Sequence, residues 1–234
     1  MKLNILSGGA AQSVVNSLAD EFRTLAGYEL DCTFGAVGAM KEKLLAGAPA
    51  DLVILTQALV AELAAGGQLL PDSCADLGRV RTGVAVRASD PRPDIASASA
   101  LRSALLAAGG IYFPDPLKAT AGIHFARVLD TLGIRSQVEQ RLKPYPNGAT
   151  AMRELAQAKG ERLLGCTQVT EINSTPDVAL VGLLPREFEL ATVYSAGICT
   201  NAAAPEAARR FIALLAGEPS RALRTKAGFE LGTA

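Results

Sequence analysis

The chain has 234 residues, of which 49% are apolar and 20% are charged, the balance of an ordinary globular protein and not of a disordered one. Lys plus Arg and Asp plus Glu number 23 each, so the chain lacks the positive charge that binds a nucleic-acid backbone, and we expect no nucleic-acid partner. No apolar run approaches the roughly 20 residues that span a bilayer, so we expect no membrane insertion.

The amino terminus has the pattern of a strand and not of a targeting segment. Met1 and Lys2 lead directly into the apolar run 3–6, which is too short for the core of a signal peptide. We therefore expect a cytoplasmic protein, or a periplasmic one if a leader peptide has been removed.

Short apolar runs alternate with helical patterns along the chain, which is typical of βαβ units. In the first third we predict strands at 3–6, 28–34 and 51–55. The helices between them are expected to end near Ala26, Gly47 and Ala65. Gly27 is well placed to stop the first of these helices, because glycine adopts the left-handed backbone conformation without strain.

Beyond residue 80 the same alternation continues. Strands are predicted at 80–86, 110–113, 163–166 and 178–181, followed by an extended stretch at 188–200. Helices are predicted at about 98–107, 121–132 and 135–142, then after a cap at Asn147 or Thr150, and twice within the last 30 residues.

Cysteine spacing and the absence of known motifs limit the possible chemistry. The four cysteines form no C-x-x-C pair and the chain has one histidine, so we expect buried free thiols and no metal site. They are Cys32, Cys74, Cys166 and Cys199. Neither a P-loop, nor G-x-G-x-x-G, nor G-x-S-x-G occurs, so we expect no cofactor.

Four segments resemble, in the same order, those of molybdate-binding proteins. The strongest is Leu44-Leu45-Ala46-Gly47-Ala48-Pro49-Ala50-Asp51-Leu52-Val53-Ile54; the others are 113–116 with 121–123, 164–167 and 227–229. The resemblance covers essentially the whole chain and implies the type II periplasmic (extracellular solute) binding protein fold.

This resemblance implies an α/β protein with two lobes, each a mostly parallel sheet flanked by helices. Residues 1–80 with 195–234 would form lobe 1, and residues 81–194 lobe 2. Two extended hinge strands, near 81–85 and 188–196, would join the lobes, and the ligand would lie in the cleft between them.

Such a cleft suits an anion, because helices that begin at its walls present unpaired backbone N–H groups. Four glycine- or alanine-containing helix starts, here called rims, are the expected contacts. They comprise Gly8, Gly9 and Ala10 in the first rim, Val37 and Gly38 in the second, Thr120 and Ala121 in the third, and Asn147 in the fourth. Asn147 is either a ligand contact or only a helix cap.

The departure from the family's pattern concerns the ligand. Molybdate binders have serines at the first two rims and a tyrosine from a later strand, whereas this chain has Ala10, Val37 and Gln168. Each lost hydrogen bond to a charged ligand costs about 1–3 kcal/mol. The resemblance therefore implies a small anion other than molybdate, and we expect a di- or tricarboxylate.

Three more polar residues are candidate ligand contacts. Arg81 and Thr82 lie where the chain enters the second lobe, and Arg81 either grips a carboxylate bidentately or is an exposed hinge arginine. Tyr194, in the second hinge stretch, either donates to the ligand or packs in the core.

Glu171, His124 and Lys118 are candidates for proton transfer. Each has a structural alternative: a glutamate that stabilises a helix dipole, a core histidine and a solvated loop lysine. Relatives of this fold include isomerases, aconitate isomerase among them, so one expectation is an isomerase acting on a carboxylate. The others are the receptor of an ABC-type transporter, which requires a removed leader peptide, and a cytoplasmic ligand sensor.

Overall fold

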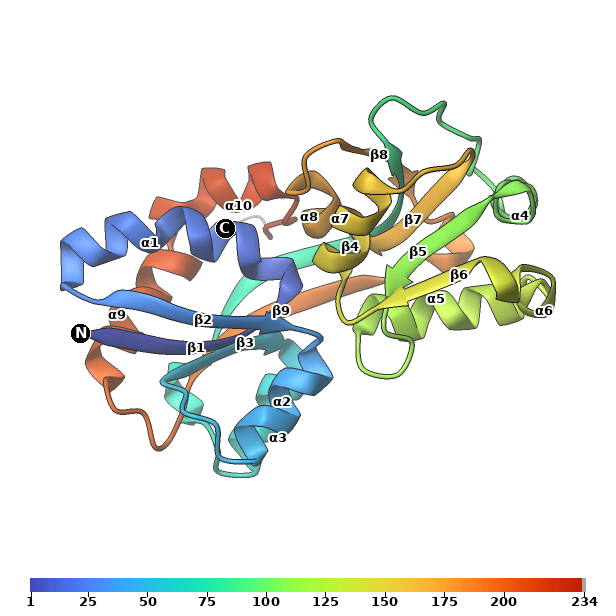
Figure 1. Cartoon of the computed structure of the whole chain (residues 1–234). Coiled ribbons are helices and arrows are strands. Elements are labelled where there is room, and N and C mark those ends of the chain that lie inside the picture. The colour runs from blue at the N-terminus through green and yellow to red at the C-terminus, as the bar shows by residue number, and fades with distance from the viewer. Residues whose placement is uncertain (233–234) are drawn as a thin grey trace. The chain divides into compact units, whose positions relative to one another are not determined.

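The computed structural model describes residues 1–232 (Figure 1). The chain divides into two compact units. Unit 1 comprises Met1–Val80 and the described residues from Thr192 onward, and unit 2 comprises Arg81–Ala191. The chain crosses from unit to unit within β4 (Ala75–Arg87) and at the start of β9 (Ala191–Ile198).

The sheet of unit 1 is built around β1 (Lys2–Gly8). This strand pairs in parallel with β2 (Glu29–Gly35) and β3 (Leu52–Thr56), and β3 pairs antiparallel with β9. Figure 1 shows α1 and α9 over one face of this sheet, and α2 and α3 over the other. The helices of this unit are α1 (Gln12–Ala26), α2 (Val37–Leu45), α3 (Gln57–Ala65), α9 (Pro205–Ala216) and α10 (Arg221–Ala227).

Local sequence explains the first helix. Val14, Leu18 and Phe22 recur at four-residue spacing and are buried, so one stripe of α1 faces the core. The Phe22 ring meets Phe211 of α9 edge-on at 5.0 Å. Gly27 ends the helix with φ 72°, as predicted for a glycine cap.

The sheet of unit 2 is centred on β5 (Gly110–Pro114), which pairs in parallel with β6 (Leu142–Tyr145) and β7 (Leu163–Gln168). β4 pairs antiparallel with β7 and with β8 (Val178–Leu183). The helices are α4 (Ala98–Ala107), α5 (Thr120–Thr131), α6 (Arg135–Val138), α7 (Gly148–Gln157) and α8 (Val169–Asn173).

Alternation along β4 builds the two faces of this sheet. Val84 belongs to an apolar cluster with Phe125 of α5, whereas Ala85 belongs to another with Met152 of α7. Successive residues of a strand face opposite sides of the sheet. Helices therefore cover both faces of this sheet, and each face has its own apolar core.

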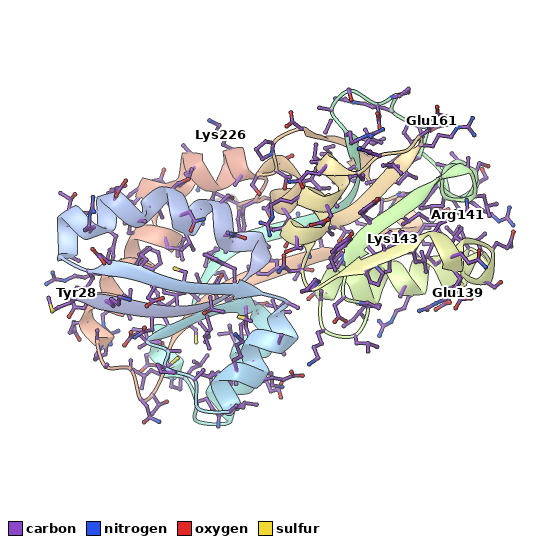
Figure 2. All side chains as sticks on the ribbon, in the orientation of Figure 1. Tyr28, Glu139, Arg141, Lys143, Glu161 and Lys226 are labelled. Carbon is purple, nitrogen blue, oxygen red and sulfur yellow. The ribbon has the colours of Figure 1, made fainter. Side chains whose placement is uncertain are left out.

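Three expectations from the sequence are corrected. The sheets are mixed and not mostly parallel, because β4, β8 and β9 pair antiparallel. The helix expected at 135–142 is α-helical to Val138 and continues as a 3₁₀ turn over Glu139–Arg141, and Leu142 begins the edge strand β6. Figure 2 shows the charged side chains of Glu139, Arg141 and Lys143 around this edge strand. Edge strands often carry charged residues, so this segment lacks the apolar pattern by which a strand is predicted.

The third correction concerns the thiols. All four cysteines are free, but only Cys166 and Cys199 are buried; Cys32 is half-buried and Cys74 is exposed. Cys74 lies just before β4, between a 3₁₀ turn and the strand, where the chain runs over the surface.

No helix within residues 1–232 is long and apolar enough to cross a bilayer. In the same range, no group of three or more His, Cys, Asp or Glu side chains is arranged to hold a metal ion.

Candidate functional site

Three polar side chains of unit 2 are buried without a hydrogen-bond partner. Thr82, Gln168 and Thr170 are 1%, 2% and 1% exposed. The hydroxyls of Thr82 and Thr170 and both amide atoms of Gln168 have no partner among residues 1–232. We call these three residues the unpaired cluster. Leaving a buried polar group unpaired costs about 1–3 kcal/mol, so each such group requires an explanation.

The fold explains how Thr82 and Gln168 come together, and Thr170 follows two residues after Gln168 in α8. Thr82 on β4 and Gln168 at the end of β7 are direct partners in the antiparallel ladder, and such partners point to the same face of a sheet with Cβ atoms about 5 Å apart. Gln168 is also the residue that caps α8, yet its side chain makes no capping hydrogen bond. Its amide therefore makes no hydrogen bond within residues 1–232.

Glu171 lies one turn further along the chain and, unlike the unpaired cluster, has hydrogen-bond partners within the protein. Its carboxylate accepts a 2.5 Å hydrogen bond from Thr167 Oγ1, and the backbone N–H groups of Gly148, Ala149 and Gln168 also donate to it. The side chain is buried, and this burial raises the pKa of Glu171, while the hydrogen bonds act in the other direction.

The fourth predicted rim is consequently filled by the chain itself. Gly148 and Ala149 begin α7, where backbone N–H groups and the helix dipole attract an anion, and that anion is the Glu171 carboxylate. A Cβ on Gly148 would collide with Glu171 Oε2 and Thr167 Oγ1. Asn147 acts as the helix cap, because its Oδ1 accepts from the Thr150 N–H at 2.8 Å.

The third rim is open by comparison. No side chain caps α5, whose first residues are Thr120 and Ala121, and this helix packs on β7. Gly122 is required there, since a Cβ would collide with the carbonyl oxygens of Pro114 and Asp115. Lys118 is exposed on the preceding loop, where its backbone N–H donates to Asp115 Oδ1 at 3.1 Å.

His124, on the second turn of α5, is half-buried, and its Nε2 lies 2.8 Å from the carbonyl oxygen of Phe188. A carbonyl oxygen only accepts, so Nε2 carries the proton of this hydrogen bond. In the neutral ring Nδ1 is then a proton acceptor.

Arg81 and Thr82 do not act together. Neighbouring residues on β4 face opposite sides of the sheet, and the Arg81 guanidinium forms an ion pair with Glu189 at 2.9 Å. Its positive charge is therefore balanced within unit 2.

In unit 1 the first two rims and the second hinge stretch come together. A Cβ built on Gly8 would lie 2.7 Å from Val37 Cγ1 and 3.3 Å from Tyr194 Cε1. Ala10, Val37 and Tyr194 are buried, and Tyr194 packs edge-on against Phe229 at 6.5 Å. Gly9 and Gly38 are half-buried beside them. No side chain caps the helices that begin here. The backbone N–H groups at these helix starts therefore lie beside apolar side chains.

Sequence reasoning missed two polar residues of unit 2, Thr167 and Thr170. Both lie, with Gln168 and Glu171, in the segment 167–171 that comes after the buried apolar run 163–166 of β7. A polar segment at the carboxyl end of a buried strand was the available signal, because ligands of α/β sheets bind at that end.

The chain is similar to known proteins along most of its length. A family model described as bacterial extracellular solute-binding protein matches residues 3–230. An aconitate isomerase of Pseudomonas sp. is 29% identical over 225 residues, which are 92% of this chain and 82% of that protein. The molybdate-binding protein ModA of Escherichia coli K12 is 22% identical over 201 residues, covering 84% and 77%.

A solved structure of the periplasmic molybdate-binding protein of Azotobacter vinelandii superimposes with a TM-score of 0.80 and 20% identity, covering 99% of this chain and 100% of that one. This match confirms an α/β fold like that of the periplasmic binding proteins.

Proposed function

Because the chain belongs to the bacterial extracellular solute-binding protein family, whose members bind small solutes, we propose that it binds a di- or tricarboxylate and isomerises it. The observation that carries this proposal is the unpaired cluster of Thr82, Gln168 and Thr170. Two hydroxyls and an amide are neutral hydrogen-bond donors, and hydrogen bonds to a charged group contribute about 1.5–3 kcal/mol each. The similarity to an aconitate isomerase supports the choice of substrate class.

The lining of the first two rims supports an organic ligand over an inorganic oxyanion. Ala10 and Val37 offer methyl groups where a compact oxyanion needs hydroxyl donors. A polycarboxylate has both a carbon skeleton to bury against such groups and oxygen atoms to accept from backbone N–H groups.

Isomerisation of an unsaturated carboxylate requires a proton to leave one carbon and a proton to arrive at another, while the double bond shifts between them. Among the three candidates, His124 retains a proton-accepting atom, Nδ1, because its Nε2 donates to Phe188. Glu171 already accepts from four donors, and the Lys118 ammonium can only donate when it is charged. We therefore assign the base to His124 and a structural role to Glu171.

The test is incubation of the pure protein with cis-aconitate and trans-aconitate, followed by NMR. We expect each isomer to be converted into the other and to stabilise the protein against heat, by about 2.7 kcal/mol at 100 times its dissociation constant. His124→Gln should bind aconitate and fail to convert it. No conversion by the wild-type protein would overturn the isomerase assignment.

A receptor that binds and does not convert is the second candidate. It is favoured by the fold, which is that of a periplasmic molybdate-binding protein. In the same experiment a receptor would be stabilised by a carboxylate whose spectrum stays unchanged. Stabilisation by molybdate alone would contradict both candidates.

A further inference from the structure

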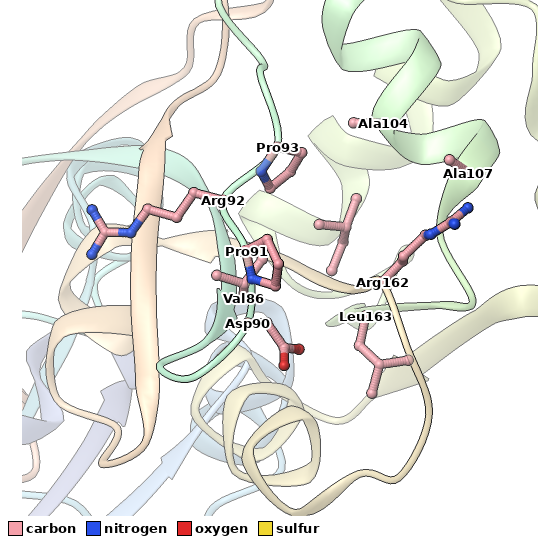
Figure 3. A pocket seen from close by; sticks show the side chains of 10 residues that line it. Val86, Asp90, Pro91, Arg92, Pro93, Ala104, Ala107, Arg162 and Leu163 are labelled. Atoms are coloured by element: carbon pink, nitrogen blue, oxygen red, sulfur yellow. The ribbon is translucent and has the colours of Figure 1, made fainter.

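Unit 2 contains a cavity formed by the loop after β4, the helix α4 and the start of β7. Its volume is about 260 Å³. The wall is mainly apolar and includes Val86, Pro91, Pro93, Ala104, Ala107 and Leu163. Figure 3 shows these side chains around one space. Thr82 and Gln168 do not line it, so it is separate from the unpaired cluster.

Two arginines that line this cavity, Arg92 and Arg162, have no counterion among residues 1–232. Asp90 is paired with Arg87, whose Nε and Nη2 donate to it at 2.7 and 2.9 Å. Arg162, by contrast, is an exposed member of the lining whose guanidinium forms no hydrogen bond or ion pair with residues 1–232. The cavity therefore combines an apolar interior with an unbalanced positive charge.

The backbone at Arg162 is strained. Its φ is 53°, in the left-handed region, which costs a residue with a side chain about 1–2 kcal/mol. The Arg162 carbonyl accepts from the Gly109 N–H at 3.1 Å, which holds this conformation. Such strain is concentrated at functional sites, and glycine would relieve it.

We propose that this cavity binds a small monocarboxylate with an apolar body, such as a benzoate-sized aromatic acid, and that Arg162 pairs with its carboxylate. A cavity of about 150 Å³ holds benzene, so 260 Å³ accommodates a ring and one carboxylate. The apolar wall disfavours a second carboxylate, because an unpaired charge is costly to bury. The ligand class is therefore different from the polycarboxylate of the first site.

The test is a titration of the full chain with benzoate, followed by amide chemical shifts in NMR. Saturable shifts at Ala104, Ala107 and Leu163 are expected. Arg162→Gly removes the guanidinium and relieves the strain, so it should fold at least as stably and bind benzoate at least about tenfold more weakly. Ala104→Phe fills the cavity and should also weaken binding.

Controls separate this site from others. Arg127→Gln should bind benzoate normally, because Arg127 of α5 is exposed and does not line the cavity. Gln168→Leu should also bind normally, which distinguishes this proposal from the proposed function. The proposal is overturned if benzoate causes no shifts, if Arg162→Gly binds it as tightly as the wild type, or if benzyl alcohol binds as well as benzoate.

Discussion

Thr167 Oγ1 donates a 2.5 Å hydrogen bond to Glu171 Oε2, four residues further along the chain. With the N–H groups of Gly148 and Ala149, it surrounds a buried carboxylate at the start of α7. The polar end of β7 thus has two parts. Glu171 accepts its hydrogen bonds from the chain, whereas Gln168, three residues earlier, has no hydrogen-bond partner among residues 1–232.

The Thr167→Val variant tests the satisfied part. It keeps the shape of the side chain and removes one donor to a buried carboxylate, so we expect the free energy of unfolding to fall by about 1–3 kcal/mol. Urea unfolding gives this value, and Thr167→Ser, which keeps the hydroxyl, is the matched control. Equal stability of the valine and serine variants would show that the hydrogen bond contributes nothing.

Gly148→Ala should be destabilising for a steric reason. The added methyl group would collide with Glu171 and Thr167, and forcing atoms into a packed core costs about 1–3 kcal/mol. The control is Gly182→Ala on β8, where the new Cβ meets Ile95 at an ordinary 3.5 Å. Similar unfolding free energies for the two variants would contradict the packing described here.

The pH dependence of stability should report on Glu171. Burial raises its pKa in the folded chain above the ordinary 4.5, so the unfolded chain releases this proton at the lower pH. The contribution of Glu171 to stability is therefore largest below pH 4.5, falls as the pH rises through the raised pKa, and is constant above it. Relative to Glu171→Gln, the wild type should lose stability over this window. Urea unfolding from pH 4 to 8 checks this, and parallel profiles would argue against the shift.

Thiol reactivity should follow exposure. Burial raises the pKa of all four thiols, that of Cys32 and of Cys199 to about 12, which suppresses the reactive thiolate form. Only Cys74 is exposed to a reagent. Titration of the native protein with a disulfide reagent should give one rapid phase, which Cys74→Ser removes. Rapid reaction of a second thiol would show that the core opens readily.

The sequence predicted the regular elements well where the apolar periodicity ends at a residue that stops or starts a helix. Gly27 ends α1, Gln57 begins α3, and Ala98–Ala107 is a helix at the expected bounds. It failed where a tertiary partner decides the structure. Leu142–Tyr145 contains a lysine and a proline and is a strand only because β5 pairs with it.

For the candidate site, the sequence identified the polar residues but not the groups with which they form hydrogen bonds. Asn147 was expected to be either a ligand contact or only a helix cap, and it caps α7. The resemblance placed Gly8, Val37 and Tyr194 around one cleft, but nothing in the sequence indicates that Gly148 and Ala149 donate to Glu171. Those contacts join separate strands and helices, and only the folded sheet brings them together.

The Gln168→Leu variant tests the central claim most directly, through its aconitate affinity and its free energy of unfolding without ligand. Leucine is similar in size and removes two buried, unpaired polar atoms, so we expect the unliganded protein to be as stable as the wild type or more so. Aconitate affinity, measured by calorimetry, should fall at least about tenfold, because a hydrogen bond to a charged ligand is lost. A destabilised variant that still binds aconitate normally would contradict the account, since Gln168 would then serve the fold and not the ligand.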